Sequence, residues 1–508
     1  MAFGMHGHEG REPVVETTAG RVVGLRLSAG AIRFAGIPYA RAPIGALRFQ
    51  PPQRPEPWWD LRDARDFGPS AIQPLDAHEP ASLVAQSEDC LRVNLWTPDL
   101  GAARRPVLVF IHGGGYYGGG AHDATYDGAR FVERGDVVLV TVQYRLGPLG
   151  WLDLEALGGT DWRQSKNVGL LDQRLALVWV HENIARFGGD PDNVTIFGES
   201  AGGSSVTTLL LMPAARGLFH KVIAQSGTFE YRRSAERARR TTRDFLARTG
   251  MRDLEALVAL SPEAVREAEA ALTEEAELCS DWLFGPVFDG ELLPEDPYAS
   301  IASGDTAGIP LLHGTTADEY HYWLLYFRDR MQRQPEESLG RLLTEALGVP
   351  EDQLFALLQL LAESDPAASE PERYIRAATL EFFRWPHARL AEAQSRHAPT
   401  WLYRFGWSNP ATPELGAYHG LELPFVFHNL ADAGTARAPE ALAARMQDSW
   451  IAFARYGDPN HRGIPRWPAF DPTRPEQLVF DTSFHLAPDP ERALRARWGA
   501  IRAGGARP

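Results

Sequence analysis

The sequence predicts an α/β fold with a large, mainly parallel β-sheet flanked by helices, and three observations support this. Short apolar runs typical of buried strands recur at residues 107–111, 137–143, 194–197, 222–225, 309–312 and 401–405. Helical patterns separate several of them, most clearly at 169–187, and such alternation indicates a parallel sheet covered by helices. The length of 508 residues with 44% hydrophobic residues allows a large buried core.

One large domain is expected over residues 13–500, because no Gly/Ser-rich or Pro-rich linker, low-complexity tract or internal repeat divides the chain. Residues 1–12 and 501–508 are expected to be flexible tails. Two long helical stretches, about 234–279 and 320–395, are rich in Ala, Leu, Glu and Arg. They are expected to be insertions over the carboxyl edge of the sheet, where a cap would close a pocket.

Composition restricts the partners and the compartment. The net charge of −15 argues against nucleic acid as a partner, since phosphate contacts require a basic face. No apolar run is long enough to span a membrane, and the first residues lack the basic and apolar regions of a secretory signal. Cys90 and Cys279 are too few for a disulfide framework. A cytoplasmic location is therefore expected, while the oligomeric state, monomer or dimer, stays open.

The apolar run at 194–197 leads into the sequence Gly-Glu-Ser-Ala-Gly at 198–202, followed by a helix-compatible segment. Gly-x-Ser-x-Gly between a strand and a helix predicts a sharp turn that projects a nucleophilic serine, Ser200, above the sheet. Gly198 and Gly202 would supply the small neighbours that such a turn needs. A flexible loop is the alternative, but the strand before the motif and the helix after it favour the turn.

A second glycine-rich motif, His-Gly-Gly-Gly at 112–115, follows the apolar run at 107–111. Backbone N–H groups that no side chain shields can bind a developing oxyanion. Taken alone, the loop could equally be a phosphate cradle or a turn. Its position before the Gly-x-Ser-x-Gly motif matches the arrangement of lipases and esterases, so an oxyanion site is expected.

Further motifs extend along the chain: Phe-Ala-Gly-Ile-Pro-Tyr-Ala at 34–40, Arg-Phe-Gln-Pro-Pro at 48–52, Ser-Glu-Asp-Cys-Leu-Arg-Val-Asn at 87–94, Asn-Val-Gly-Leu-Leu-Asp-Gln-Arg at 167–174, the segment 179–191, Gly-Pro-Val-Phe-Asp-Gly at 285–290 and Phe-Ala-Arg-Tyr-Gly-Asp-Pro-Asn at 453–460. With these motifs the chain resembles the type-B carboxylesterases, which include bacterial para-nitrobenzyl esterases, liver carboxylesterases and cholinesterases. The resemblance covers about residues 13–480. It implies an α/β-hydrolase fold and serine-dependent ester hydrolysis.

A serine nucleophile needs a histidine base, and in this fold the acid and then the base follow the serine along the chain. The residues alone leave nine candidate histidines after Ser200: His220, His313, His321, His387, His397, His419, His428, His461 and His485. The resemblance selects His419, in the segment Gly-Ala-Tyr-His-Gly-Leu-Glu-Leu-Pro-Phe at 416–425.

Two carboxylates compete for the acid, because Asp318 and Glu319 both follow the apolar run at 309–312. The resemblance assigns Glu319 and leaves Asp318 as a loop or cap residue. It also implies that Glu199 is a buried group near the histidine and that Ser226 hydrogen-bonds into the same network. Extracellular members often pair the cysteine at the position of Cys90 with an earlier one, but Ala71 occupies that earlier position, so no loop disulfide is expected.

The predicted function is carboxylic-ester hydrolysis, with an ester and water as the small-molecule partners and with no metal or organic cofactor. Ser200 would attack the carbonyl carbon, His419 would carry the proton, Glu319 would orient the imidazole, and the N–H groups of Gly114, Gly115 and Ala201 would bind the oxyanion. The same groups could hydrolyse carbamates or activated amides, and a more remote alternative is a non-catalytic binding protein. Seven aromatic residues are candidates for an apolar pocket or for the core: Tyr116, Tyr117, Trp282, Phe284, Tyr320, Tyr322 and Trp323.

Overall fold

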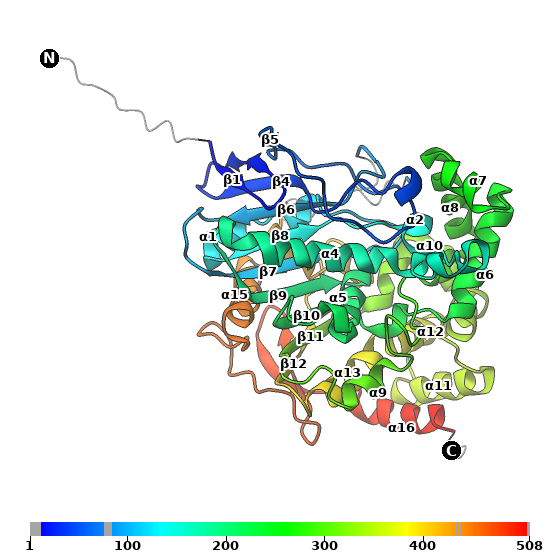
Figure 1. Ribbon diagram of the computed structural model, residues 1–508. Coiled ribbons are helices and arrows are strands. Elements are labelled where there is room, and N and C mark those ends of the chain that lie inside the picture. The colour runs from blue at the N-terminus through cyan, green and yellow to red at the C-terminus, as the bar shows by residue number, and fades with distance from the viewer. Residues whose placement is uncertain (1–11, 76–83, 432–434, 436–437, 505–508) are drawn as a thin grey trace.

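The computed structural model describes residues 12–75, 84–431, 435 and 438–504, and within them the chain forms an α/β fold around one large sheet (Figure 1). The described part of the sheet has 11 strands in the spatial order β14 (His485–Pro488), β13 (Glu476–Phe480), β12 (Thr400–Phe405), β11 (Leu311–Thr316), β10 (Lys221–Gln225), β9 (Gly189–Glu199), β7 (Arg105–Ile111), β8 (Val138–Val142), β6 (Arg92–Thr97), β4 (Ile32–Pro38) and β3 (Leu25–Arg26). Neighbouring strands from β13 through β8 are parallel, and those at both edges are antiparallel. The predicted fold class is confirmed.

All six predicted apolar runs are strands of this sheet, namely β7 to β12. The run predicted at 309–312 is displaced, because β11 begins at Leu311 and continues to Thr316. Its second half includes Gly314, where a Cβ atom would lie 2.4 Å from the ring of Tyr403 on the neighbouring strand. Close packing therefore requires a residue there that carries no apolar signal. The edge strands β3, β4, β6, β13 and β14, and a small sheet of β1 (Val14–Glu16), β2 (Arg21–Val23) and β5 (Arg62–Asp63), were not predicted.

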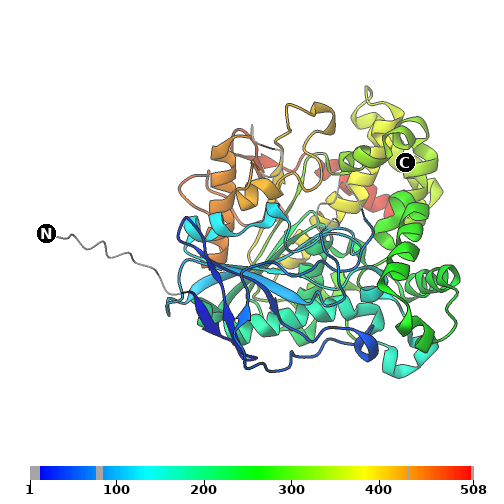
Figure 2. The same ribbon diagram turned by 90° about the horizontal axis from the view of Figure 1, so that it is seen from above.

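Helices cover both faces of the sheet and gather at one end of it (Figures 1 and 2). The helical pattern predicted at 169–187 is α4 (Val168–Asn183) followed by η6 (Ile184–Phe187). The two predicted helical stretches contain α6 (Ala235–Thr249), α7 (Leu254–Ala259) and α8 (Pro262–Ala276), and then α10 (Leu324–Arg333), α11 (Glu351–Ser364), α12 (Glu370–Thr379) and α13 (Trp385–Gln394). The remaining α-helices of the described residues are α1 (Ala129–Gly135), α2 (Gly147–Trp151), α3 (Glu155–Gly158), α5 (Ala201–Leu211), α9 (Pro297–Ala302), α14 (Leu423–Phe427), α15 (Glu440–Tyr456) and α16 (Arg492–Arg502).

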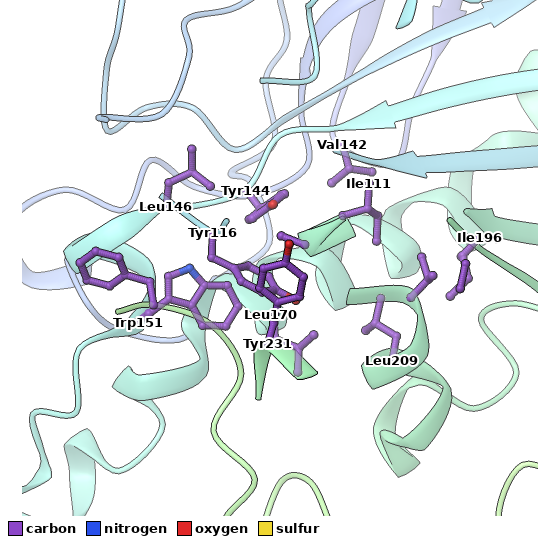
Figure 3. Packing of buried hydrophobic residues seen from close by; sticks show 14 of the residues in the cluster. Ile111, Tyr116, Val142, Tyr144, Leu146, Trp151, Leu170, Ile196, Leu209 and Tyr231 are labelled. Atoms are coloured by element: carbon purple, nitrogen blue, oxygen red, sulfur yellow. The ribbon is translucent and has the colours of Figure 1, made fainter. Parts of the chain in front are cut away.

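The strands are buried on both faces, as the apolar runs of a parallel sheet require. Strand β7 illustrates this, since Val107, Val109 and Ile111 belong to one hydrophobic cluster and the alternate residues Leu108 and Phe110 belong to another. Helices α4 and α5 pack in the first cluster, and α1 and α15 in the second. Figure 3 shows part of the first cluster, in which the rings of Tyr116, Trp151 and Tyr231 pack together.

A buried ion pair fastens the loop after β8 to helix α4. The guanidinium of Arg145 donates two hydrogen bonds to the carboxylate of Asp172, each 2.7 Å long, and the backbone N–H of Arg145 adds a third. The two side chains are only 3% and 0% exposed. Such a pair is costly to break, because the remaining charge would stay buried without a partner.

Several predictions concern the termini, the cysteines and membranes. The predicted tail 1–12 lies outside the described residues except for Glu12, whereas α16 extends into the predicted tail 501–508 as far as Arg502, and 505–508 lie outside. Both cysteines are free, and burial raises the pKa of the Cys90 thiol. No helix in the described segments has the length and apolar character needed to cross a bilayer.

Candidate active site

Ser200 stands on a sharp turn between β9 and α5, as the motif predicts. Its backbone has φ +59° and ψ −123°, a conformation that L-residues rarely adopt. The turn depends on its glycines: a Cβ at Gly198 would lie 2.4 Å from the carbonyl oxygen of Gly202, and one at Gly202 would lie 2.0 Å from that of Ile111. The N–H of Ser200 donates to the carbonyl of Gln225 on the adjacent strand, at 2.9 Å. Neighbouring strands therefore fix the position of the serine.

The predicted acid and base are brought together at the carboxyl edge of the sheet. Glu319 follows β11 at the start of η10 (Glu319–Trp323), and its Oε2 lies 2.6 Å from Nδ1 of His419. Its Oε1 accepts hydrogen bonds from Oγ of Ser226, at 2.7 Å, and from the N–H of Thr316, at 2.8 Å. Burial acts to raise the pKa of Glu319, but the contacts with His419 and Ser226 outweigh it and lower that pKa. The carboxylate is thus ionised and held on both oxygens.

Asp318, the competing carboxylate, bonds to the loop that carries the histidine. Its Oδ2 accepts a hydrogen bond from the N–H of Ala417 at 2.8 Å, and its own N–H donates to the carbonyl of Ala417 at 2.9 Å. The N–H of His419 also donates to the carbonyl of Glu319, at 3.3 Å. The loops that carry the acid and the base are therefore joined through their backbones as well as through the Glu319–His419 contact.

Carboxylates surround the imidazole of His419. Its Nε2 lies 3.2 Å from Oε1 of Glu199, which is 6% exposed, and Glu319 holds the opposite nitrogen. Burial alone would lower the pKa of His419, but Glu199, Glu319 and Glu422 together raise it to about 9. The site therefore favours the imidazolium form, which is the form that a base reaches after it accepts a proton.

The hydroxyl of Ser200 is hydrogen bonded to Tyr231, a residue that the sequence analysis did not identify. The two oxygens are 2.8 Å apart. The described residues show no hydrogen bond between Oγ of Ser200 and Nε2 of His419, although both side chains line one pocket. No sequence signal marks Tyr231, because its contact depends on how the segment after β10 folds back over the turn.

The glycine loop after β7 forms the wall beside the serine. Gly114 and Gly115 have φ of +100° and +58°, which glycine adopts without steric cost. A Cβ at Gly114 would lie 2.2 Å from the carbonyl oxygen of Gly118, so no other residue fits this curl. Ala201 is the first residue of α5, where a helix leaves its N–H groups without intrahelical partners. All the groups predicted to bind the oxyanion thus come from segments that border Ser200.

The serine, the histidine and the glycine loop open into one cavity of about 510 Å³. Residues of α8 and α10 also line it, so both helical stretches contribute to the wall. Of the seven aromatic candidates, Tyr117, Tyr322 and Trp323 line the cavity, whereas Tyr116, Trp282, Phe284 and Tyr320 are buried in the core. The cavity also has aromatic residues that the sequence analysis missed, namely Tyr126, Tyr231, Tyr326, Phe327 and Tyr418.

Known proteins resemble this chain in sequence and in structure. A sequence model of the carboxylesterase family matches residues 11–493. The para-nitrobenzyl esterase of Bacillus subtilis (strain 168) is 40% identical over 495 residues, which cover 95% of this chain and 98% of that protein. The phenmedipham hydrolase of Pseudarthrobacter oxydans is 34% identical, over 92% of this chain and 94% of that protein. The crystal structure of a Geobacillus stearothermophilus carboxylesterase superimposes with a TM-score of 0.86 at 39% identity, covering 96% of this chain and 99% of that one.

These matches extend over nearly the whole chain in both sequence and structure, and they include a solved bacterial enzyme of the same architecture. They confirm the resemblance inferred from the motifs. The chain belongs to the type-B carboxylesterase family and is a carboxylesterase.

Proposed function

We propose that this carboxylesterase acts through Ser200, His419 and Glu319 and forms an acyl-enzyme. The observation that carries the proposal is the 2.6 Å contact between Glu319 and Nδ1 of His419 in the pocket into which the turn projects Ser200. Glu319 holds the imidazole with Nε2 toward the cavity, and its negative charge stabilises the imidazolium. Ser200 carries the only hydroxyl group of the turn 198–202.

The reaction proceeds in two halves. When an ester binds, the proton of Ser200 passes to Nε2 of His419, and Oγ attacks the carbonyl carbon. The N–H groups of Gly114, Gly115 and Ala201 bind the oxyanion, and His419 returns the proton to the departing alcohol. Water then attacks the acyl-enzyme in the same way. Every step uses side chains and backbone groups of this chain.

The substrates we propose are small to medium apolar or aryl esters. A cavity of about 510 Å³ whose wall includes eight Tyr, Trp or Phe side chains supports this proposal, because their rings offer apolar area to a bound ester. Hydrolysis of matched ester, carbamate and anilide substrates would test the preference. An acyl-enzyme on Ser200 would be tested by labelling with a serine-directed phosphonate. Labelling that survives in Ser200→Ala, or full activity of that variant, would reject the proposed nucleophile.

We also propose that residues 13–500 form a single catalytic domain in the cytoplasm. One sheet includes strands from Leu25 to Pro488, and helix α16 packs on the second helical stretch through a 2.6 Å hydrogen bond from the indole of Trp498 to Glu381. The free thiols of Cys90 and Cys279 suit a reducing compartment. Limited proteolysis that releases a separately folded piece would contradict the single domain.

A further inference from the structure

The hydroxyl of Tyr231 contacts Oγ of Ser200, the reacting atom of the proposed nucleophile. The ring of Tyr231 packs within a cluster of aromatic side chains. Tyr231 ends the short helix η8 (Phe229–Tyr231) and is only 2% exposed. Its ring stacks on Trp282 at an interplanar angle of 11° and meets Tyr116 and Phe382 edge to face, with centroids 5.9 and 4.9 Å away. The hydroxyl of Tyr231, 2.8 Å from Oγ of Ser200, is therefore held by the packing of its ring.

A buried arginine two residues later fixes the backbone of this segment. The guanidinium of Arg233 donates three hydrogen bonds to backbone carbonyls, those of Trp151 at 2.8 Å, Leu283 at 2.6 Å and Gly285 at 3.0 Å. Its side chain is buried, so these bonds act where water does not compete. The phenol of Tyr231 is thus placed from both its ring and its backbone, as a preorganised catalytic group requires.

The direction of the Ser200–Tyr231 hydrogen bond follows from the reaction. In the resting enzyme either hydroxyl can donate. Once the proton of Ser200 has passed to His419, or once Oγ is part of an ester, Oγ has no proton and can only accept. During those steps Tyr231 must be the donor, and the hydrogen bond strengthens as negative charge grows on Oγ.

Negative charge on Oγ has opposite consequences in the two halves of the reaction. In acylation Oγ is the attacking atom, and a donor bound to it makes it a weaker nucleophile. In deacylation Oγ is the leaving atom: water adds to the acyl carbon and gives a proton to His419, the bond from carbon to Oγ breaks, and its electron pair stays on Oγ. Nε2 of His419 then returns a proton to Oγ, and Tyr231 keeps its own proton throughout.

We propose that Tyr231 is a catalytic residue of deacylation, whose phenol stabilises Oγ of Ser200 as the leaving group of the acyl-enzyme. The assignment rests on the proposed function, since it takes Ser200 as the nucleophile. A charge-assisted hydrogen bond of this kind corresponds to about 10- to 100-fold in rate. Removing the hydroxyl slows breakdown of the acyl-enzyme by that factor and leaves its formation as fast or faster.

The test compares wild type with Tyr231→Phe, which keeps the ring, and with Tyr298→Phe as a matched control. Tyr298 is a buried tyrosine whose hydroxyl donates to Glu230 in the same short helix, at 3.1 Å, away from the cavity lining. Stopped-flow measurement with p-nitrophenyl acetate gives the acylation rate from the release of nitrophenol. Quenched mass spectrometry of the acetyl-enzyme gives the deacylation rate directly.

Tyr231→Phe is expected to accumulate acetyl-enzyme, with deacylation about 10- to 100-fold slower and acylation not slower than in wild type. Tyr298→Phe is expected to keep both rates within about twofold, since the hydroxyl of Tyr298 does not contact the reacting atoms. Equal losses of both rates in Tyr231→Phe, or an unchanged deacylation rate, would overturn the assignment. Acetylation that persists in Ser200→Ala would instead refute the proposed nucleophile, so the two failures are distinguishable.

Discussion

Replacing Glu199 with glutamine should move the pH dependence of the enzyme, because this carboxylate is one of those that raise the pKa of His419. It lies 3.2 Å from Nε2 and is almost fully buried, so solvent screens it little. Raising the pKa of a histidine from 6.5 to about 9 corresponds to about 3 kcal/mol in favour of the imidazolium. Loss of one opposite charge at this distance lowers a pKa by about one to two pH units.

The sign follows from the role proposed for His419. A base must be neutral to accept the proton of Ser200, so kcat/KM rises as the pH passes through the pKa of the free enzyme. In wild type that rise is expected to be centred near pH 9. In Glu199→Gln it is centred about one to two pH units lower.

The height of the plateau changes too, because the same charge also stabilises the imidazolium that forms in the transition state. If Glu199 stabilises the imidazolium equally in the free enzyme and in the transition state, the acid limbs of the wild-type and variant profiles coincide. The plateau of the variant is then about tenfold lower for each pH unit by which the midpoint falls. At neutral pH the two enzymes differ little, so a single measurement there would miss the effect.

The assay is kcat/KM for p-nitrophenyl acetate from about pH 5 to about pH 10, corrected for spontaneous hydrolysis. Glu414→Gln is the control, since Glu414 lies in the same loop as His419 and its side chain is 51% exposed. It should leave the midpoint unchanged. A Glu199→Gln profile that coincides with wild type on the plateau and in its midpoint would refute the electrostatic reasoning.

Three further groups of variants test the site and the fold. Ser200→Ala and Glu319→Ala should each lower kcat by about 10³ to 10⁶, with no further loss in the double variant, whereas Asp318→Ala, which loses a bond to a backbone N–H, should lose at most about tenfold. A larger loss for Asp318→Ala than for Glu319→Ala would reverse the assignment of the acid. Gly115→Ala places a Cβ at a φ of +58° beside the proposed oxyanion site. It should depress hydrolysis of tert-butyl acetate about 5- to 10-fold more than hydrolysis of ethyl acetate. Equal losses for the two esters would contradict a steric role. Asp172→Ala should cost about 3 to 5 kcal/mol of unfolding free energy in urea, and a loss below about 1 kcal/mol would mean that the buried pair contributes little.

The sheet was predictable where burial on both faces leaves an uninterrupted apolar run, as in β7 and β8. It was less so in β11, whose second half contains Gly314 because the ring of Tyr403 leaves no room for a side chain. Such a requirement comes from the neighbouring strand and has no trace in the local sequence. The short strands at the edges of the sheet also lack a long apolar run, because their pairing with neighbouring strands defines them.

In the site, too, some features are encoded in the local sequence and others depend on distant segments of the chain. The turn at Ser200 is encoded locally by its glycines, so the motif alone identified it. The choice of His419 among nine histidines needed the family resemblance, because chain order gives no distance. The contact from Tyr231 to Ser200 could not be predicted, since it depends on the carbonyls that bind Arg233 from separate parts of the chain.

The backbone bonds between the loops of Glu319 and His419 have a consequence for how this enzyme can change. Two residues 100 positions apart in the chain are linked as one rigid piece by the bonds around Asp318 and Ala417. The turn of Ser200 is joined to that piece through β10, because the N–H of Ser200 bonds to the carbonyl of Gln225 and the next residue, Ser226, donates to Glu319. Helices above the cavity that make no bond to these loops can therefore be reshaped for new substrates while the acid, the base and the serine keep their positions.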